Sequence, residues 1–184
     1  MQERDSQITT KWIVITGGPG VGKSTTLNAL GHLGYETRCE AARLWIDEEM
    51  SKNKTLTEIR KPSMNFQIAV NILQEAAEAR SDPKKTIFWD RAKPDTLAYV
   101  ELFETSPLPE SHTLHLRRYH SIFLLDPLPR YNTDYARFET ETDAKRIQEK
   151  LTEVYTRLGY DVVQIPVRPV LERAQLILNH LALS

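Results

Sequence analysis

The stretch Gly17-Gly18-Pro19-Gly20-Val21-Gly22-Lys23-Ser24-Thr25 decides how this chain folds. It follows the apolar run Trp12-Ile13-Val14-Ile15, which predicts a strand. The residues after it carry apolar side chains at helical spacing: Leu27, Ala29, Leu30 and Leu33. A strand, a glycine-rich loop and a helix in this order fill every fixed position of the pattern G-x-x-x-x-G-K-[ST]. The alternative is a glycine-rich turn that merely precedes Lys-Ser, and the flanking strand and helix argue against it.

The residue types in this loop suit a nucleoside triphosphate. Glycines let successive backbone N–H groups point inward at a helix N-terminus and form an anion-binding nest. Lys23 is expected to reach the β- and γ-phosphates, and the Ser24 hydroxyl to ligate Mg²⁺. We therefore expect ATP and Mg²⁺ as cofactors. The predicted nucleotide contacts are Gly18, Pro19, Gly20, Val21, Gly22, Lys23, Ser24 and Thr25.

Length and composition restrict the class of protein. The 184 residues suggest a loose tail over 1–10 and one domain over 11–184. With 24 basic and 25 acidic residues, no basic surface favours nucleic acid or an anionic membrane. Cys39 is the single cysteine, which rules out an intramolecular disulfide, and we expect it to be a small buried residue. No run is long and apolar enough for a membrane span, and Met1–Thr10 lacks a signal-peptide core, so a cytoplasmic location is expected.

Strand and helix patterns alternate along the chain. Strands are predicted at Lys11–Thr16, Tyr35–Cys39, Thr86–Trp89, Tyr119–Leu125 and Val162–Ile165. Helices are predicted from the loop to His32, over Ala41–Met50, from Pro62, from Pro94-Asp95, from Thr140 to Gly159 and over Pro169–Leu183. The polar, lysine-rich segment Ser51–Lys61 is predicted to be a connection between helices. This alternation predicts an α/β fold with a parallel sheet, helices on both faces and ligands at the carboxyl ends of the strands.

Asp90 ends the third predicted strand and is expected to hold Mg²⁺ directly or through water. Arg91 follows it, where hydrolytic ATPases often have a glutamate that polarises water. The arginine suits a substrate anion or hydroxyl, or the transferring phosphoryl group. An ordinary turn pair after a buried strand is the alternative.

Glu40 and Arg43 stand three residues apart after the second predicted strand, on one helical face. Glu40 would accept a proton from an attacking hydroxyl, and Arg43 would orient it or bind substrate. The alternative is a surface capping glutamate with an intrahelical ion pair.

Two further segments are candidates for the substrate side. The loop from about 126 to 140 carries Arg130 and Arg137, and we expect it to act as a lid in which Arg137 neutralises phosphoryl charge. A solvated basic loop is the alternative. Phe66 is predicted to pack against a substrate ring and Gln67 to hydrogen-bond with it. The alternative is that Phe66 belongs to the core and Gln67 contacts solvent.

Taken together, these motifs resemble the P-loop family labelled "AAA domain", close to the nicotinamide riboside kinase domain of NadR. The matching segments are Gly17–Thr25, Glu40–Arg43, Phe66-Gln67, Asp90-Arg91, Asp134–Glu139 and Leu158–Pro166. The resemblance covers nearly the whole chain after residue 10. It implies a three-layer nucleoside- or nucleotide-kinase-like fold with a five-stranded parallel sheet of order 2-3-1-4-5.

The chain is also similar to deoxynucleoside kinases. That resemblance implies that Glu40 is the base, Arg91 holds the substrate and Gln67 reads a nucleobase. This chain differs from the deoxynucleoside kinase pattern at two positions. Asp90 stands where the motif E-R-S has its glutamate, and no proline follows Glu40.

The expected function is therefore an ATP- and Mg²⁺-dependent kinase of a small hydroxyl-bearing metabolite, such as a nucleoside or nicotinamide riboside. The alternative is a nucleotide-binding switch or slow NTPase that acts through a protein partner. The D-x-x-G glycine and the N-K-x-D motif of GTPase switches are missing. The acceptor, the preference for ATP over GTP, and a monomer or homodimer stay open.

Overall fold

The computed structural model describes residues 10–59, 64–112, 118–129 and 140–183. Its centre is a five-stranded parallel sheet of order β2-β3-β1-β4-β5, which confirms the expected topology. The strands are β1 (Trp12–Thr16), β2 (Glu36–Arg38), β3 (Ile87–Asp90), β4 (Ser121–Leu125) and β5 (Val162–Ile165). Ile15 of β1 lies opposite Asp90 of β3 and Phe123 of β4. The carboxyl ends of the three central strands therefore meet at one edge of the sheet.

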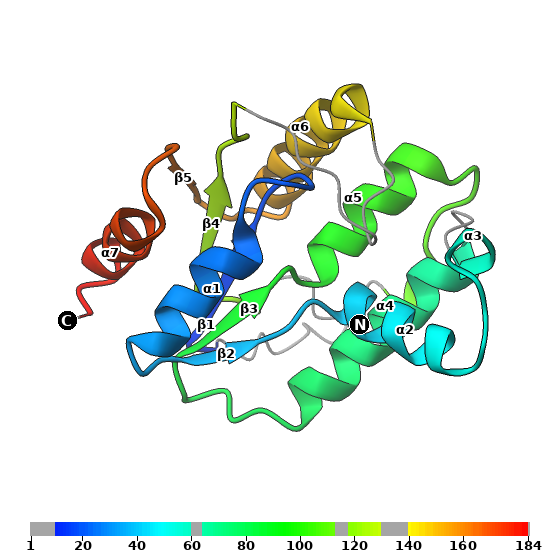
Figure 1. Ribbon diagram of the computed structural model, residues 1–184, viewed down its shortest axis with the longest axis horizontal. Coiled ribbons are helices and arrows are strands. Elements are labelled where there is room, and N and C mark those ends of the chain that lie inside the picture. Colours follow the sequence, from blue (N-terminus) through cyan, green and yellow to red (C-terminus); the bar gives the residue numbers. More distant parts are fainter. Residues whose placement is uncertain (1–9, 60–63, 113–117, 130–139, 184) are drawn as a thin grey trace, which may run out of the picture.

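The described helices lie on both sides of this sheet (Figure 1). They are α1 (Lys23–His32), α2 (Ala41–Ser51), α3 (Leu56–Ile59), α4 (Met64–Ala79), α5 (Lys93–Phe103), α6 (Glu141–Arg157) and α7 (Val170–His180), with a 3₁₀ turn, η1, at Glu110–His112. Among these described residues, no helix has both the length and the apolar character needed to cross a membrane.

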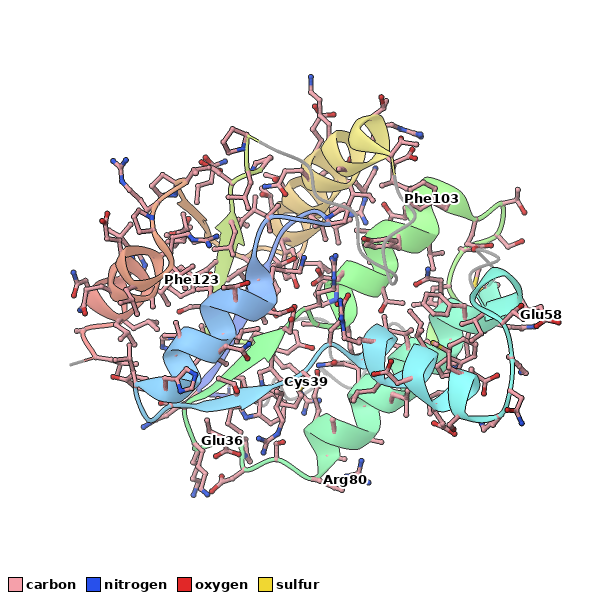
Figure 2. The ribbon with its side chains drawn as sticks, in the orientation of Figure 1. Glu36, Cys39, Glu58, Arg80, Phe103 and Phe123 are labelled. Carbon is pink, nitrogen blue, oxygen red and sulfur yellow. The ribbon has the colours of Figure 1, made fainter. Side chains whose placement is uncertain are left out.

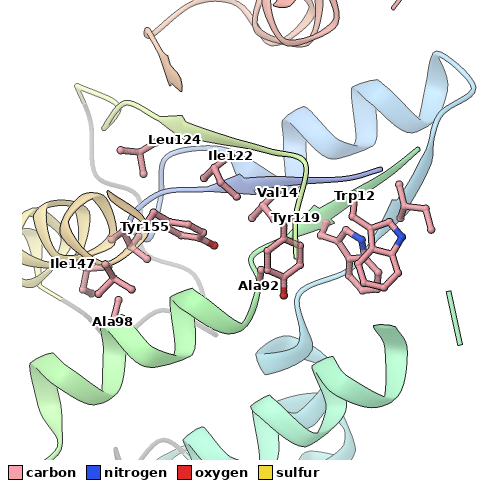
Figure 3. Close-up of a cluster of buried hydrophobic side chains, with 13 residues drawn as sticks. Trp12, Val14, Ala92, Ala98, Tyr119, Ile122, Leu124, Ile147 and Tyr155 are labelled. Atoms are coloured by element: carbon pink, nitrogen blue, oxygen red, sulfur yellow. The ribbon is translucent and has the colours of Figure 1, made fainter. Parts of the chain in front are cut away.

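Alternate residues of each central strand face opposite layers. Trp12 and Val14 of β1 pack with residues of α5 and α6, among them Tyr155, in the cluster shown in Figure 3. Ile13 and Ile15 face the other way and pack against α1 and α7. Both faces of the sheet are covered, and every residue of β1 and β3 is buried; all are apolar except the last residue of each strand, Thr16 and Asp90.

Two details differ from the sequence predictions. The Ser51–Lys61 connection contains α3, because Thr55 and Glu58 form a capping box in which Thr55 N donates to Glu58 Oε2 at 2.8 Å. Cys39, labelled in Figure 2 just after β2, is exposed, so the expectation of a buried cysteine is wrong. The physical reason is that β2 is an edge strand, with neighbours on one side only.

Element boundaries also shift. The fourth strand begins at Ser121 rather than Tyr119, whose buried ring turns away to hydrogen-bond with Glu78. The last helix ends at His180 rather than Leu183, since Ala182 has a φ of 52° and leaves the helical conformation. Pro62 lies outside the described residues.

Candidate active site

The phosphate loop joins the buried end of β1 to the first turn of α1. Gly20 and Gly22 have φ values of 81° and 89°, in the left-handed region that glycine tolerates. The Lys23 ammonium turns back onto the loop, where it donates to the carbonyls of Gly17 at 3.1 Å and Gly18 at 2.9 Å. Burial, together with the positive charge of the nearby Arg91, lowers the pKa of Lys23 from 10.5 to about 8. The loop therefore holds a cation whose charge is poorly compensated until an anion binds.

Two residues remote in sequence hold this loop in place. Gln148 of α6 accepts from Gly18 N at 2.7 Å and donates to Leu125 O at 3.0 Å. Arg173 of α7 is buried beneath the loop and donates from Nη1 to Val21 O at 2.8 Å. A Cβ on Gly22 would lie 2.9 Å from Arg173 Nη2. Sequence reasoning missed both supports, since the contacts span 130 and 152 residues and leave no local pattern.

Ser24 and Asp90 meet where β3 ends beside α1. Ser24 Oγ donates to Asp90 Oδ2 at 2.9 Å, while Asp90 Oδ1 is buried and has no hydrogen-bond partner among the described residues. Burial raises the pKa of Asp90 from 3.8 to about 6, with a further contribution from the charge of Glu40. A carboxylate with a free buried oxygen next to a hydroxyl fits Mg²⁺, which prefers oxygen ligands.

The described residues hold no group of three or more His, Cys, Asp or Glu side chains that could form a metal site by themselves. In phosphoryl-transfer sites Mg²⁺ binds through one or two protein ligands together with substrate phosphates and water. Ser24 and Asp90 are thus the candidate ligands.

Glu40 stands at the N-cap position of α2, yet within the described structure its side chain makes no capping hydrogen bond. Instead its Oε1 accepts from Arg91 Nε at 2.7 Å. Burial by itself would raise the pKa of Glu40, but the charges of Arg91 and Lys23 outweigh it, and the net pKa is lowered. The carboxylate therefore stays ionised at neutral pH and faces the phosphate site rather than capping its own helix.

Arg91 is held from several sides. Its backbone is left-handed, with a φ of 66°, which non-glycine residues adopt only where surrounding contacts enforce it. Nη1 donates to Asp95 Oδ1 at 3.1 Å and Nη2 donates to Tyr99 OH at 3.2 Å. Asp95 also accepts from Thr16 Oγ1 at 2.6 Å and from Tyr155 OH at 2.5 Å. Arg91 precedes α5, so its four-residue spacing from Asp95 is not a helical one, and the sequence analysis did not predict this pair.

One cavity of about 380 Å³ brings most of the predicted site residues together. Its lining includes Lys23, Ser24, Glu40, Arg43, Phe66, Gln67 and Arg91. Residues that the sequence analysis did not single out line it as well: Gln74, Asp95, Thr96, Tyr99 and Phe103, the last of which is labelled in Figure 2 at the end of α5. Arg130 and Arg137 lie outside the described residues, as does most of the 126–140 lid segment.

The phosphate loop also borders a second cavity, of about 510 Å³. Pro19 and Gly20 line both cavities, while Lys145 and Gln148 of α6 line only the second. The loop thus stands between a space bounded by α2, α4 and α5 and a space bounded by α6.

Solved structures share this fold over nearly the whole chain. NadR in complex with NR has a TM-score of 0.71 at 17% identity, and the match covers 96% of this chain and 53% of NadR. Deoxyadenosine kinase from M. mycoides has a TM-score of 0.63 at 18% identity, covering 93% of this chain and 98% of that one. Thymidylate kinase from Ehrlichia chaffeensis has a TM-score of 0.65 at 13% identity, covering 95% and 100%. This chain spans about half the length of NadR.

The sequence itself matches one protein family. No curated protein matches the chain. Residues 12–173, however, match a family described as "AAA domain", from the first strand to the arginine beneath the phosphate loop. The match takes in both the phosphate loop and the end of β3. The chain therefore belongs to this AAA-domain family and has a P-loop, kinase-like fold.

Proposed function

We propose that this protein is an ATP- and Mg²⁺-dependent phosphotransferase whose acceptor is a hydroxyl of a small metabolite. One observation carries the proposal. A single cavity runs from Lys23 and Ser24 of the phosphate loop to the Glu40–Arg91 pair and on to Phe66 and Gln67 of α4. Such a cavity offers a triphosphate and a second molecule neighbouring places, as phosphoryl transfer requires.

The donor side would use the phosphate loop. Backbone N–H groups of residues 18–25 and the ammonium of Lys23 would hold the phosphates, with Lys23 leaving its two loop carbonyls to do so. Ser24 and Asp90 would hold Mg²⁺, which when bound would neutralise charge on the transferring phosphoryl group. The second cavity, next to Lys145, borders the phosphate loop on its other side and would take the nucleoside part of ATP.

On the acceptor side, Glu40 would orient the attacking hydroxyl and take its proton. The hydroxyl oxygen would bond to the γ-phosphorus as the bond from that phosphorus to the β,γ-bridging oxygen breaks, releasing ADP. Arg91, fixed by Glu40 and Asp95, would place a cation next to the moving phosphoryl group. Arg43 would contact the substrate, and Arg137 of the proposed lid would complete the charge compensation.

The outer wall of the cavity suits a ring-bearing acceptor. Phe66 packs edge-on against Trp45, with ring centroids 5.3 Å apart, and Tyr99 and Phe103 lie 5.9 Å apart. Aromatic walls of this kind favour a flat ring, such as that of a nucleoside or of nicotinamide riboside. The NadR structure in complex with NR and the deoxyadenosine kinase structure with dCMP agree with this class of acceptor.

The test is ATP-dependent phosphorylation of a panel of nucleosides, pyridine ribosides and other small alcohols, repeated with GTP. Glu40→Gln is expected to lower kcat by about 10²- to 10⁴-fold, as loss of a general base does. Glu149→Gln, at an exposed position of α6, is the matched control and should keep wild-type activity. Tight ATP binding with no product from any acceptor would overturn the proposal and favour the nucleotide-dependent switch.

A further inference from the structure

Gln74 of α4 is a buried amide that opens into the acceptor cavity. Its side chain is 4% exposed, and it lines the cavity together with Gln67 and Val70 of the same helix. Gln67, Val70 and Gln74 follow each other at intervals of three and four residues, so they share one helical face. Gln74 lies two turns, or about 10 Å, along the helix from Gln67.

A chain of hydrogen bonds determines which end of the Gln74 amide faces the cavity. Lys93 N donates to Tyr119 OH at 3.3 Å, so the Tyr119 hydroxyl gives its own proton to Glu78 Oε1, at 2.6 Å. Burial, with the charge of Glu78, raises the pKa of Tyr119, which keeps that proton in place. Arg118 Nη1 donates to Glu78 Oε2 at 2.8 Å. Glu78 is therefore a carboxylate that can only accept hydrogen bonds.

The Gln74 group that lies 2.9 Å from Glu78 Oε1 must then be its NH₂, since two oxygens there would repel each other. The opposite end of the amide, Oε1, is left for the cavity. No described residue donates a hydrogen bond to this oxygen. Because Gln74 lines the cavity, this oxygen is accessible there, and a ligand with an N–H or O–H group could bond to it in place of water.

Gln74 lies near the start of α5. Its neighbour Glu75 pairs with Lys93 at the first residue of α5, with Nζ and Oε1 2.5 Å apart. Ala92 and Asp95, which flank Lys93, line the same cavity, and Asp95 holds Arg91. The Gln74 carbonyl therefore faces the part of the cavity that the start of α5 borders.

We propose that Gln74 determines substrate specificity by accepting a hydrogen bond from an N–H group of the acceptor molecule. This inference rests on the proposed phosphotransferase function. It selects ring-bearing alcohols with a primary amide or exocyclic amino group over counterparts that carry a carboxylate or carbonyl oxygen in its place. The oxygen of such a counterpart would face the Gln74 oxygen, and the rigid Glu78 network prevents the amide from turning over.

The experiment compares three matched pairs: nicotinamide riboside with nicotinic acid riboside, cytidine with uridine, and adenosine with inosine. For any pair that is phosphorylated, wild-type kcat/KM is expected to be about 10- to 100-fold higher for the N–H-bearing member. Gln74→Leu should bring the ratio of the two kcat/KM values close to one. It should raise KM for the N–H-bearing compound and change KM for the oxygen-bearing compound little. Gln164→Leu, at an exposed position of β5, should leave the ratio unchanged.

Calorimetric binding of the same pairs separates this inference from the proposed function. A binding preference that Gln74→Leu abolishes, without phosphoryl transfer, supports the role of Gln74 and overturns the kinase proposal. Phosphoryl transfer with equal kcat/KM within every pair, or with a preference for the oxygen-bearing compounds, overturns the role of Gln74. In that case the proposed kinase function still stands. If Gln74→Leu does not fold, the wild-type preference alone decides, and failure of all six compounds to bind also overturns the inference.

Discussion

Replacing Asp90 with asparagine should make the ligand-free protein more stable while removing a proposed Mg²⁺ ligand. Asp90 is 3% exposed, and its pKa is raised from 3.8 to about 6 because burial disfavours the charged carboxylate. Asparagine is similar in shape, carries no charge and can still accept from Ser24 Oγ. The substitution therefore removes the burial penalty and keeps the one hydrogen bond at this carboxylate.

The size of the effect follows from proton linkage. A pKa difference of about two corresponds to about 3 kcal/mol, and this is the expected gain in free energy of unfolding at pH 7.5. Since the folded-state pKa is the higher one, the folded protein binds more protons than the unfolded chain between pH 3.8 and 6. Wild-type stability therefore falls as the pH rises through this window. At pH 5 Asp90 is largely protonated in the folded state, so the advantage of asparagine shrinks to about 1.5 kcal/mol.

Urea denaturation of the wild type and Asp90→Asn at pH 5 and pH 7.5 measures both numbers. Asp161→Asn, the same change at an exposed position, is the control and should alter stability by less than about 0.5 kcal/mol. Adding Mg²⁺ and ATP at 100 times Kd should stabilise the wild type by about 2.7 kcal/mol and the variant by clearly less. A variant less stable than the wild type at pH 7.5, or a difference that does not shrink at pH 5, would show that the buried Asp90 carboxylate does not destabilise the fold.

Three other substitutions test the supports of the site. Arg173→Met should weaken ATP binding about 10-fold in calorimetry, because the Val21 carbonyl loses its donor; an unchanged Kd would contradict this. Tyr155→Phe should lower the free energy of unfolding by about 1 to 3 kcal/mol, since Asp95 loses a buried hydrogen bond, and equal urea midpoints would speak against it. Thr140→Ala should cost about 1 kcal/mol by removing the α6 cap, and an unaltered midpoint would show that this cap is dispensable.

Some parts of the site were predictable because their chemistry depends on local spacing. The nine-residue phosphate loop, the strand before it and the helix after it form one continuous segment, so the pattern alone indicates their arrangement. The capping box at Thr140 and Asp143 likewise marks the start of α6. Asp90 followed from its position at the end of a buried strand.

Other parts depend on contacts between distant segments. The sequence supported two roles for Glu40 equally, a general base or a helix-capping residue, and residue spacing did not distinguish between them. The structure places Arg91 at 2.7 Å from it, 51 residues away, while the capping bond is missing among the described residues. The orientation of the Gln74 amide depends on Glu78, Arg118 and Tyr119, which belong to separate elements.

The fold class and the phosphate loop follow from the amino-acid sequence, because hydrophobic periodicity and loop geometry are local properties of the chain. The charges that surround this loop are brought there by tertiary packing. A salt bridge or a buried carboxylate depends on the through-space distance between side chains and on their removal from water, and neither is encoded at any single position. The phosphate loop could thus be recognised from nine residues, whereas the cavity that faces it needed the packing of α2, α4 and α5 against the edge of the sheet.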